Sequence, residues 1–121
     1  LPIVVNKIKK MLVSNQIDIY YKGKEISLNV SKILYIEKNG QYTHIVTEKN
    51  TYIVKHSMKY YEKRLSLKMF GYVSQGFLAN YQYVESENSQ YVLMKNGHVS
   101  YYSRGRRKRF LDNYLKYITL V

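Results

Sequence analysis

A dense group of basic residues lies near the C-terminal end of the chain. Five of the six residues from 104 to 109 are arginine or lysine, and only Gly105 interrupts the run. The planar guanidinium of arginine offers a fork of donors that suits phosphate oxygens and the edge of guanine. A strand-like segment precedes this run and a helical pattern follows it, so ordered elements hold it on both sides. We therefore expect the run to bind a polyanion, with Arg104 as its main contact.

Two other junctions between expected strands carry side chains that read base edges or hold phosphates. The first covers residues 38–44, including His44, and the second is Ser74-Gln75-Gly76. Glutamine can pair with adenine through N6 and N7, as arginine does with guanine through O6 and N7. Each residue also has a purely structural interpretation. His44 can simply face solvent on a strand, and Gln75 can bridge its own turn by bonding to backbone.

The net charge supports a polyanionic partner. The chain has 121 residues, with 20 Lys+Arg against 8 Asp+Glu, giving a formal net charge of +12. This length fits one domain. Nucleic acid is the first class of partner that such a charge indicates, and an anionic membrane surface is the second. The alternative is that the charge serves solubility alone.

The residues for most other chemistries are missing. There is no cysteine, which excludes disulfides and thiolate chemistry and agrees with a reducing cytoplasm. His44, His56 and His98 do not have metal-ligand spacing, and no phosphate-cradling glycine-rich loop opens a helix. Glu85 and Glu87 could form an acid–base pair, but a solvated strand face explains them better. We expect a cytoplasmic protein that is not an enzyme and needs no cofactor or metal. No apolar run approaches the roughly 18 residues that span a bilayer.

The elements that position these residues are mainly strands. Alternating, aromatic-rich segments predict about nine or ten short strands, and regular turn signals favour a β-sandwich. Asn39-Gly40 and Asn96-Gly97 are typical of tight hairpins, whereas residues 77–80 are interpreted as a short buried turn. The expected strands cover residues 17–22, 25–30, 33–36, 42–47, 51–55, 70–73, 83–86, 91–94 and 99–102.

Two or three short helices complete the prediction. Residues 1–16 are interpreted as an amphipathic helix that either packs on the domain or ends a linker, and residues 17–121 form the domain itself. Ser57 can cap a short helix whose inward stripe is Met58, Tyr61 and Leu65. A terminal helix begins near Arg107, and its spacing predicts an inward stripe of Phe110, Leu111, Tyr114, Leu115 and Ile118.

In order and spacing, these segments resemble the LytTR family of bacterial DNA-binding domains. The opening segment, the hairpin after it, a strand with a short helix, and a closing hairpin all have counterparts, as does the Ser103-Arg104 pair. Where the family often has His-Arg-Ser, this chain has Ser74-Gln75-Gly76, which shifts the expected base preference there from guanine toward adenine. The matching segments are residues 30–37, 40–45, 52–65, 70–80 and 92–97.

This resemblance implies an elongated β-sandwich that binds double-stranded DNA for a bacterial transcription regulator. Its loops would read successive major grooves at repeated half-sites, with two copies bound as a dimer on DNA. Such domains usually follow the receiver domain of a two-component response regulator, so we expect an upstream receiver or other sensor domain. By position, the base-reading residues are His44, Gln75 and Arg104. The expected backbone contacts are Lys38, Asn39, Tyr42, Ser74, Ser103, Arg106, Arg107 and Lys108.

Two other classes of function remain open from the residues alone. A basic interaction module could bind a protein or an anionic membrane surface through the terminal helix. A phosphate-processing enzyme could use the basic residues as substrate clamps, although no base, nucleophile or metal site is evident in the sequence. Vesicle binding that competes with DNA would favour the first, and turnover of a nucleotide would favour the second.

Overall fold

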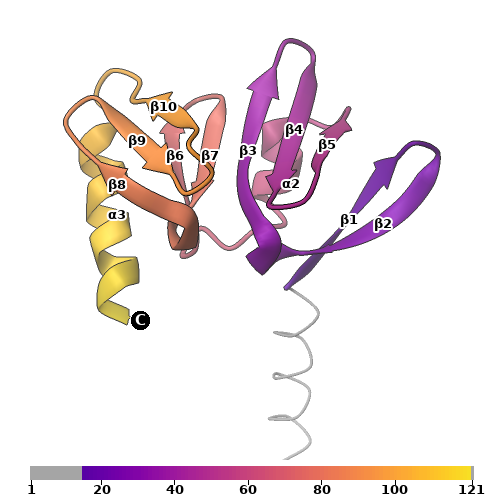
Figure 1. Ribbon diagram of the computed structural model, residues 1–121, viewed down its shortest axis with the longest axis horizontal. Helices are drawn as coiled ribbons and strands as arrows, with labels where there is room; N and C mark the ends of the chain where they lie inside the picture. The colour runs from indigo at the N-terminus through magenta and orange to yellow at the C-terminus, as the bar shows by residue number, and fades with distance from the viewer. Residues whose placement is uncertain (1–14, 121) are drawn as a thin grey trace, which may run out of the picture.

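The computed structural model describes residues 15–120, so residues 1–14 of the expected helix lie outside the described residues, whereas Gln16 is the first residue of a strand. Within this range the chain forms ten strands in three antiparallel sheets, with two α-helices and two 3₁₀-helices. The mainly β prediction is confirmed (Figure 1). The strands are β1 Gln16–Tyr21, β2 Lys24–Asn29, β3 Ile33–Asn39, β4 Tyr42–Thr47, β5 Thr51–Val54, β6 Phe70–Ser74, β7 Phe77–Asn80, β8 Val84–Glu87, β9 Tyr91–Met94 and β10 Val99–Tyr101. The helices are η1 Val30–Lys32, α2 Met58–Glu62, η2 Tyr81–Tyr83 and α3 Arg107–Leu120.

A five-stranded sheet in the order β5-β4-β3-β7-β6 is the centre of the fold. The β1–β2 hairpin and the β10-β9-β8 sheet lie on either side of it (Figure 1). The interpretation of residues 77–80 as a turn was wrong, because they form strand β7, which pairs with both β3 and β6. All four residues of β7 are buried. A strand covered on both faces has no alternating pattern, so its sequence cannot be distinguished from a buried turn.

Two separate hydrophobic cores stabilise the two faces of the central sheet. The first core packs α2 and the β1–β2 hairpin against the sheet through Ile36, Ile45 and Leu78. The second packs the three-stranded sheet and α3 against the other face, around Val73 and Phe77. Strand β3 contributes to both cores, which explains why its residues 33–36 are all buried.

The turns and the short helix follow the local sequence. Gly40 and Gly97 have φ of 62° and 91° in the β3–β4 and β9–β10 turns, a backbone region that glycine enters without steric cost. Both hairpins expected from Asn-Gly pairs are therefore confirmed. Ser57 accepts a hydrogen bond from the Tyr60 amide at the start of α2. The inward stripe expected after it, Met58, Tyr61 and Leu65, is buried in the first core.

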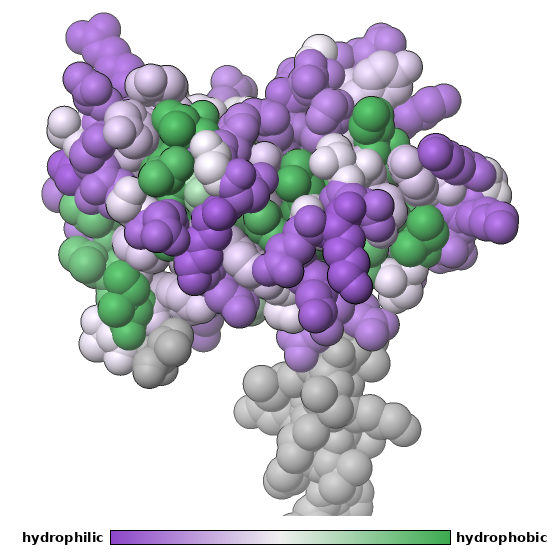
Figure 2. Space-filling view, viewed as in Figure 1, coloured by the Kyte–Doolittle hydropathy of each residue, from purple (hydrophilic) through white to green (hydrophobic). Residues whose placement is uncertain are grey.

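Helix α3 begins at Arg107 as expected, but it is rotated relative to the predicted stripe. Phe110 is buried, whereas Leu115 and Ile118 are about half exposed, at 51% and 49%. Hydrophobic side chains accordingly reach the surface over α3 (Figure 2). Tyr81 instead contacts three aromatic rings of the helix, with centroids 5.5–5.7 Å away, which are Phe110, Tyr114 and Tyr117. Large rings bury more apolar area than leucine or isoleucine, so the aromatic stripe faces the core.

Candidate nucleic-acid interface

Three loops lie at the same end of the molecule: the β3–β4 turn, the β6–β7 turn and the β10–α3 loop (Figure 1). The Lys38 amide, near the end of β3, donates to the Gly76 carbonyl of the β6–β7 turn at 2.8 Å. The Ser103 amide of the β10–α3 loop donates to the Val73 carbonyl of β6 at 3.1 Å. These bonds hold two of the loops against neighbouring strands, so side chains at this end of the molecule can face one partner together.

The predicted base readers His44 and Gln75 lie along one transverse row of the central sheet. His44 pairs with Glu37 on β3, Glu37 with Phe77 on β7, and Phe77 with Ser74 on β6, immediately before Gln75. Neighbouring strands lie about 4.8 Å apart, so about 14 Å of sheet separates the backbones of His44 and Ser74. His44 is half-buried within strand β4, whereas Gln75 is exposed at its turn.

The third predicted reader, Arg104, is exposed in the β10–α3 loop. Gly105, with φ of 75°, turns the chain after it, and the Arg106 amide donates to the Ser103 carbonyl at 3.0 Å. The Ser103–Val73 bond places this loop beside the β6–β7 turn. The structure thus brings Gln75 and Arg104 to adjoining loops, and it places His44 three strands away in the same sheet.

The expected backbone contacts differ in how free their side chains are. Lys38, Asn39, Ser103 and Lys108 are exposed, Tyr42 is 39% exposed, and Ser74 is half-buried. The Arg106 guanidinium lies 5.7 Å from the centroid of the Tyr72 ring, within cation–π range.

Glu87 holds Arg107 at the surface of the domain, where the Arg107 side chain is 40% exposed. Its Nε and one terminal nitrogen each donate to the Glu87 carboxylate at 3.1 Å, and Nε also donates to the Asn88 carbonyl at 3.0 Å. The Tyr102 hydroxyl donates to the same carboxylate at 2.8 Å. Burial, together with this bond to Glu87, raises the pKa of Tyr102 well above its ordinary value. Glu87 therefore anchors the start of α3, whereas Glu85 is exposed on β8.

A second histidine supports the row that contains His44. His98 Nε2 lies 3.3 Å from the Glu37 carboxylate, and its ring stacks on Tyr35 and Phe77 with centroids 5.0 and 5.4 Å away. No sequence pattern indicated this pair, because residues 37 and 98 meet only when the β9–β10 turn lies against strand β3. Glu37 thereby contacts His98 from the position directly opposite His44.

Among residues 15–120, no three His, Cys, Asp or Glu side chains are grouped to hold a metal ion. Within that range no helix has the length and apolar character needed to cross a bilayer. What this end of the molecule offers is a set of cationic, amide and hydroxyl side chains on loops of a rigid sheet, an arrangement suited to binding.

Comparisons with known proteins agree with this description. The family model described as the LytTr DNA-binding domain matches residues 23–114, most of the chain, and the chain belongs to this family. A solved structure with the same fold is the LytTr DNA-binding domain of a protein described as a methyl-accepting/DNA response regulator from Bacillus cereus. It has a TM-score of 0.70 and 19% sequence identity, and the match covers 82% of this chain and 95% of that one. No curated protein gave a significant match.

Proposed function

We propose that this domain binds double-stranded DNA sequence-specifically, as the DNA-binding part of a bacterial transcription regulator in the cytoplasm. The observation that carries the proposal is the placement of three loops at one end of the molecule, where the Lys38–Gly76 bond ties the β6–β7 turn to β3 and the Ser103–Val73 bond ties the β10–α3 loop to β6. Membership of a family of DNA-binding domains supports it. The domain acts by binding, without catalysis, in a response regulator whose receiver or other sensor domain lies upstream.

Phosphate contacts supply most of the affinity in this proposal. The formal net charge is +12, and exposed Lys38 and Lys108 lie on the first and third loops or next to them. Neutralised phosphates release counterions, so the logarithm of affinity falls with that of salt by about 0.9 for each phosphate contacted. Arg107 serves instead to position the start of α3, because Glu87 holds its guanidinium.

Base contacts supply the selectivity. Arg104 suits guanine and Gln75 suits adenine. His44, on strand β4, donates a hydrogen bond to a purine. Bases stack about 3.4 Å apart along each DNA strand. His44 and Gln75 project from backbone positions about 14 Å apart, so they would contact bases roughly four positions apart. Loops that enter successive major grooves, and two copies bound as a dimer on repeated half-sites, would complete the complex.

A gel-shift series separates the two roles. Arg104→Ala should lower affinity for the selected site by about 1–3 kcal/mol and leave scrambled DNA nearly unaffected. Lys108→Ala should weaken binding to both DNAs alike and reduce the salt slope by about 1. Lys32→Ala is the charge-matched control, because Lys32 is exposed at the far end of β3, about 23 Å from its turn.

Two results would contradict this proposal. Equal losses from Arg104→Ala and Lys108→Ala on both DNAs would remove the division between readers and phosphate contacts. An equal loss from Lys32→Ala would show that only total charge matters. Random-site selection with the domain should return a repeated motif, and its spacing would report the arrangement of the two copies.

A further inference from the structure

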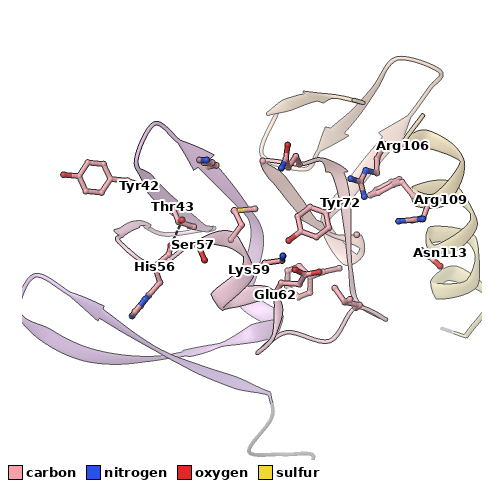
Figure 3. A pocket seen from close by; sticks show the side chains of 18 of the residues that line it. Tyr42, Thr43, His56, Ser57, Lys59, Glu62, Tyr72, Arg106, Arg109 and Asn113 are labelled. Carbon is pink, nitrogen blue, oxygen red and sulfur yellow. Dashed lines mark hydrogen bonds between the residues drawn. The ribbon is translucent and has the colours of Figure 1, made fainter. Parts of the chain in front are cut away.

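A groove of about 840 Å³ runs beside β6, the edge strand of the central sheet. Residues of the β3–β4 hairpin and α2 line one side of it, and residues of β6 and the start of α3 line the other (Figure 3). Its volume lies in the range of small-molecule sites, about 300–1,000 Å³.

The rim of the groove is strongly cationic. Five lysine or arginine side chains line it against a single carboxylate, that of Glu62. Lys59 and Glu62 come from α2, whereas Arg109 comes from the first turn of α3 and Arg106 lies just before that helix (Figure 3). The remaining two cations are Lys38 and Lys55. This excess of positive charge selects for anions.

The deeper surface of the groove is apolar and aromatic. Met58, Phe70 and Phe110 line it and are buried. Tyr72 stands between the two sides (Figure 3), and burial together with the neighbouring Glu62 raises its pKa to about 12. Tyr72 is therefore a neutral phenol at physiological pH, with a flat ring and a hydroxyl to offer a ligand.

A buried hydroxyl without a partner lies beside the groove. Tyr81 is only 2% exposed, and its Oη has no hydrogen-bond partner within the described part of the chain. Tyr81 and Gly71 both line the groove, and the hydroxyl lies where a side chain at position 71 would be. A buried donor without an acceptor is costly, so a ligand atom that accepted a hydrogen bond from the Tyr81 hydroxyl would bind favourably.

We propose that this groove binds a small organic anion with a flat aromatic body and a phosphate, sulfonate or carboxylate group. The rim cations pair with the charge, the apolar surface and Tyr72 pack against the body, and Tyr81 donates to a polar atom at depth. A duplex could place phosphates at the rim, but it would leave the apolar surface and the Tyr81 hydroxyl unused. Those two features favour a small ligand.

The test uses the 121-residue chain without DNA, and naphthalene-1-sulfonate as the probe. Calorimetry should show it binding at least about tenfold more tightly than neutral naphthalene-1-sulfonamide or inorganic sulfate, a ratio equal to about 1.4 kcal/mol. In amide NMR spectra, the signals of Gly71 and Tyr72 should shift. If inorganic sulfate bound as tightly as naphthalene-1-sulfonate, only the charged rim would take part in binding, and the proposal would be overturned.

Variants locate the binding. Arg109→Gln and Lys59→Gln should each weaken naphthalene-1-sulfonate binding by about fivefold or more, as expected for a lost charged contact. Lys32→Gln and Lys63→Gln are matched controls, because both lysines are exposed and lie outside the groove lining. Tyr81→Phe keeps the ring and should also weaken binding, while circular dichroism checks that the variant is folded.

The same variants distinguish a small-ligand site from a surface for duplex DNA. If Arg109→Gln and Lys59→Gln weaken DNA binding but leave naphthalene-1-sulfonate binding unchanged, the rim serves phosphates of a duplex and the proposal is wrong. Losses in the controls equal to those in the groove variants would also overturn it. Because naphthalene-1-sulfonate binding is measured without DNA, it can succeed or fail independently of whether the domain reads a DNA sequence.

Discussion

Asn80 should be one of the most sensitive single positions in the fold. Its side chain is fully buried, its Nδ2 donates to the Ile33 carbonyl at 2.8 Å, and its Oδ1 accepts from the Gln82 amide at 3.0 Å. Asn80→Ala removes both bonds and leaves the buried Ile33 carbonyl without this donor. A buried polar group left without a hydrogen-bond partner costs about 1–3 kcal/mol, and the loss of a helix cap costs about 1 kcal/mol. We therefore expect Asn80→Ala to lower the free energy of unfolding by about 2–4 kcal/mol.

Asn29 provides a matched control. It caps η1 with nearly the same geometry, its Oδ1 accepting from the Ser31 amide at 3.0 Å, just as Asn80 caps η2. Asn29 is exposed, however, so Asn29→Ala should lower the free energy of unfolding by only about 1 kcal/mol. The two caps therefore differ in burial and in the long-range bond to Ile33.

Urea unfolding followed by circular dichroism measures both variants. In thermal scans, Asn80→Ala should reduce Tm by roughly 10 °C, since 1 kcal/mol corresponds to about 4 °C in a domain of this size. An equal, small loss of stability in Asn80→Ala and Asn29→Ala would contradict this prediction. That result would mean that the bond between Asn80 and Ile33 adds nothing to the local cap.

Two further expectations concern Tyr81 and its surroundings. Gly71→Ala should destabilise the domain by about 1–3 kcal/mol in urea unfolding, because the new Cβ would collide with the Tyr81 ring and hydroxyl; unchanged stability would mean that the ring moves aside freely. Stability should also fall between pH 10 and 12, because burial raises the pKa of Tyr61 and Tyr81 from 10.0 to about 12 in the folded state. The unfolded chain loses these protons first, so each tyrosine contributes a loss of about 1.4 kcal/mol per pH unit in that window. Tyr81→Phe should flatten the pH dependence, and a variant with an unchanged slope would exclude Tyr81 as a cause.

The amino-acid sequence by itself determined the local features of this protein. The Asn-Gly pairs set the β3–β4 and β9–β10 turns, Ser57 caps α2, and α3 begins at Arg107. Each depends on the conformational preferences or hydrogen bonds of residues only a few positions apart, so the local sequence is sufficient to predict it. The order of the matching segments was also enough to indicate the family.

Only the tertiary structure decided which of these elements meet. Strand β7 is central because β3 and β6 pair with it from both sides, and its own four residues carry no periodic signal. The rotation of α3 depends on Tyr81, which lies outside the helix. The Arg107 guanidinium is paired because folding brings the Glu87 carboxylate opposite it.

Contacts between residues far apart in the chain also create both candidate sites. Gln75 and Arg104 adjoin because a backbone bond joins Ser103 to Val73, and the groove exists because α2 and α3 flank the same strand edge. Such contacts link residues far apart in the chain, and their strength depends on burial and distance after folding. No local pattern encodes them, so the sequence predicted the chemical groups and the fold determined their positions.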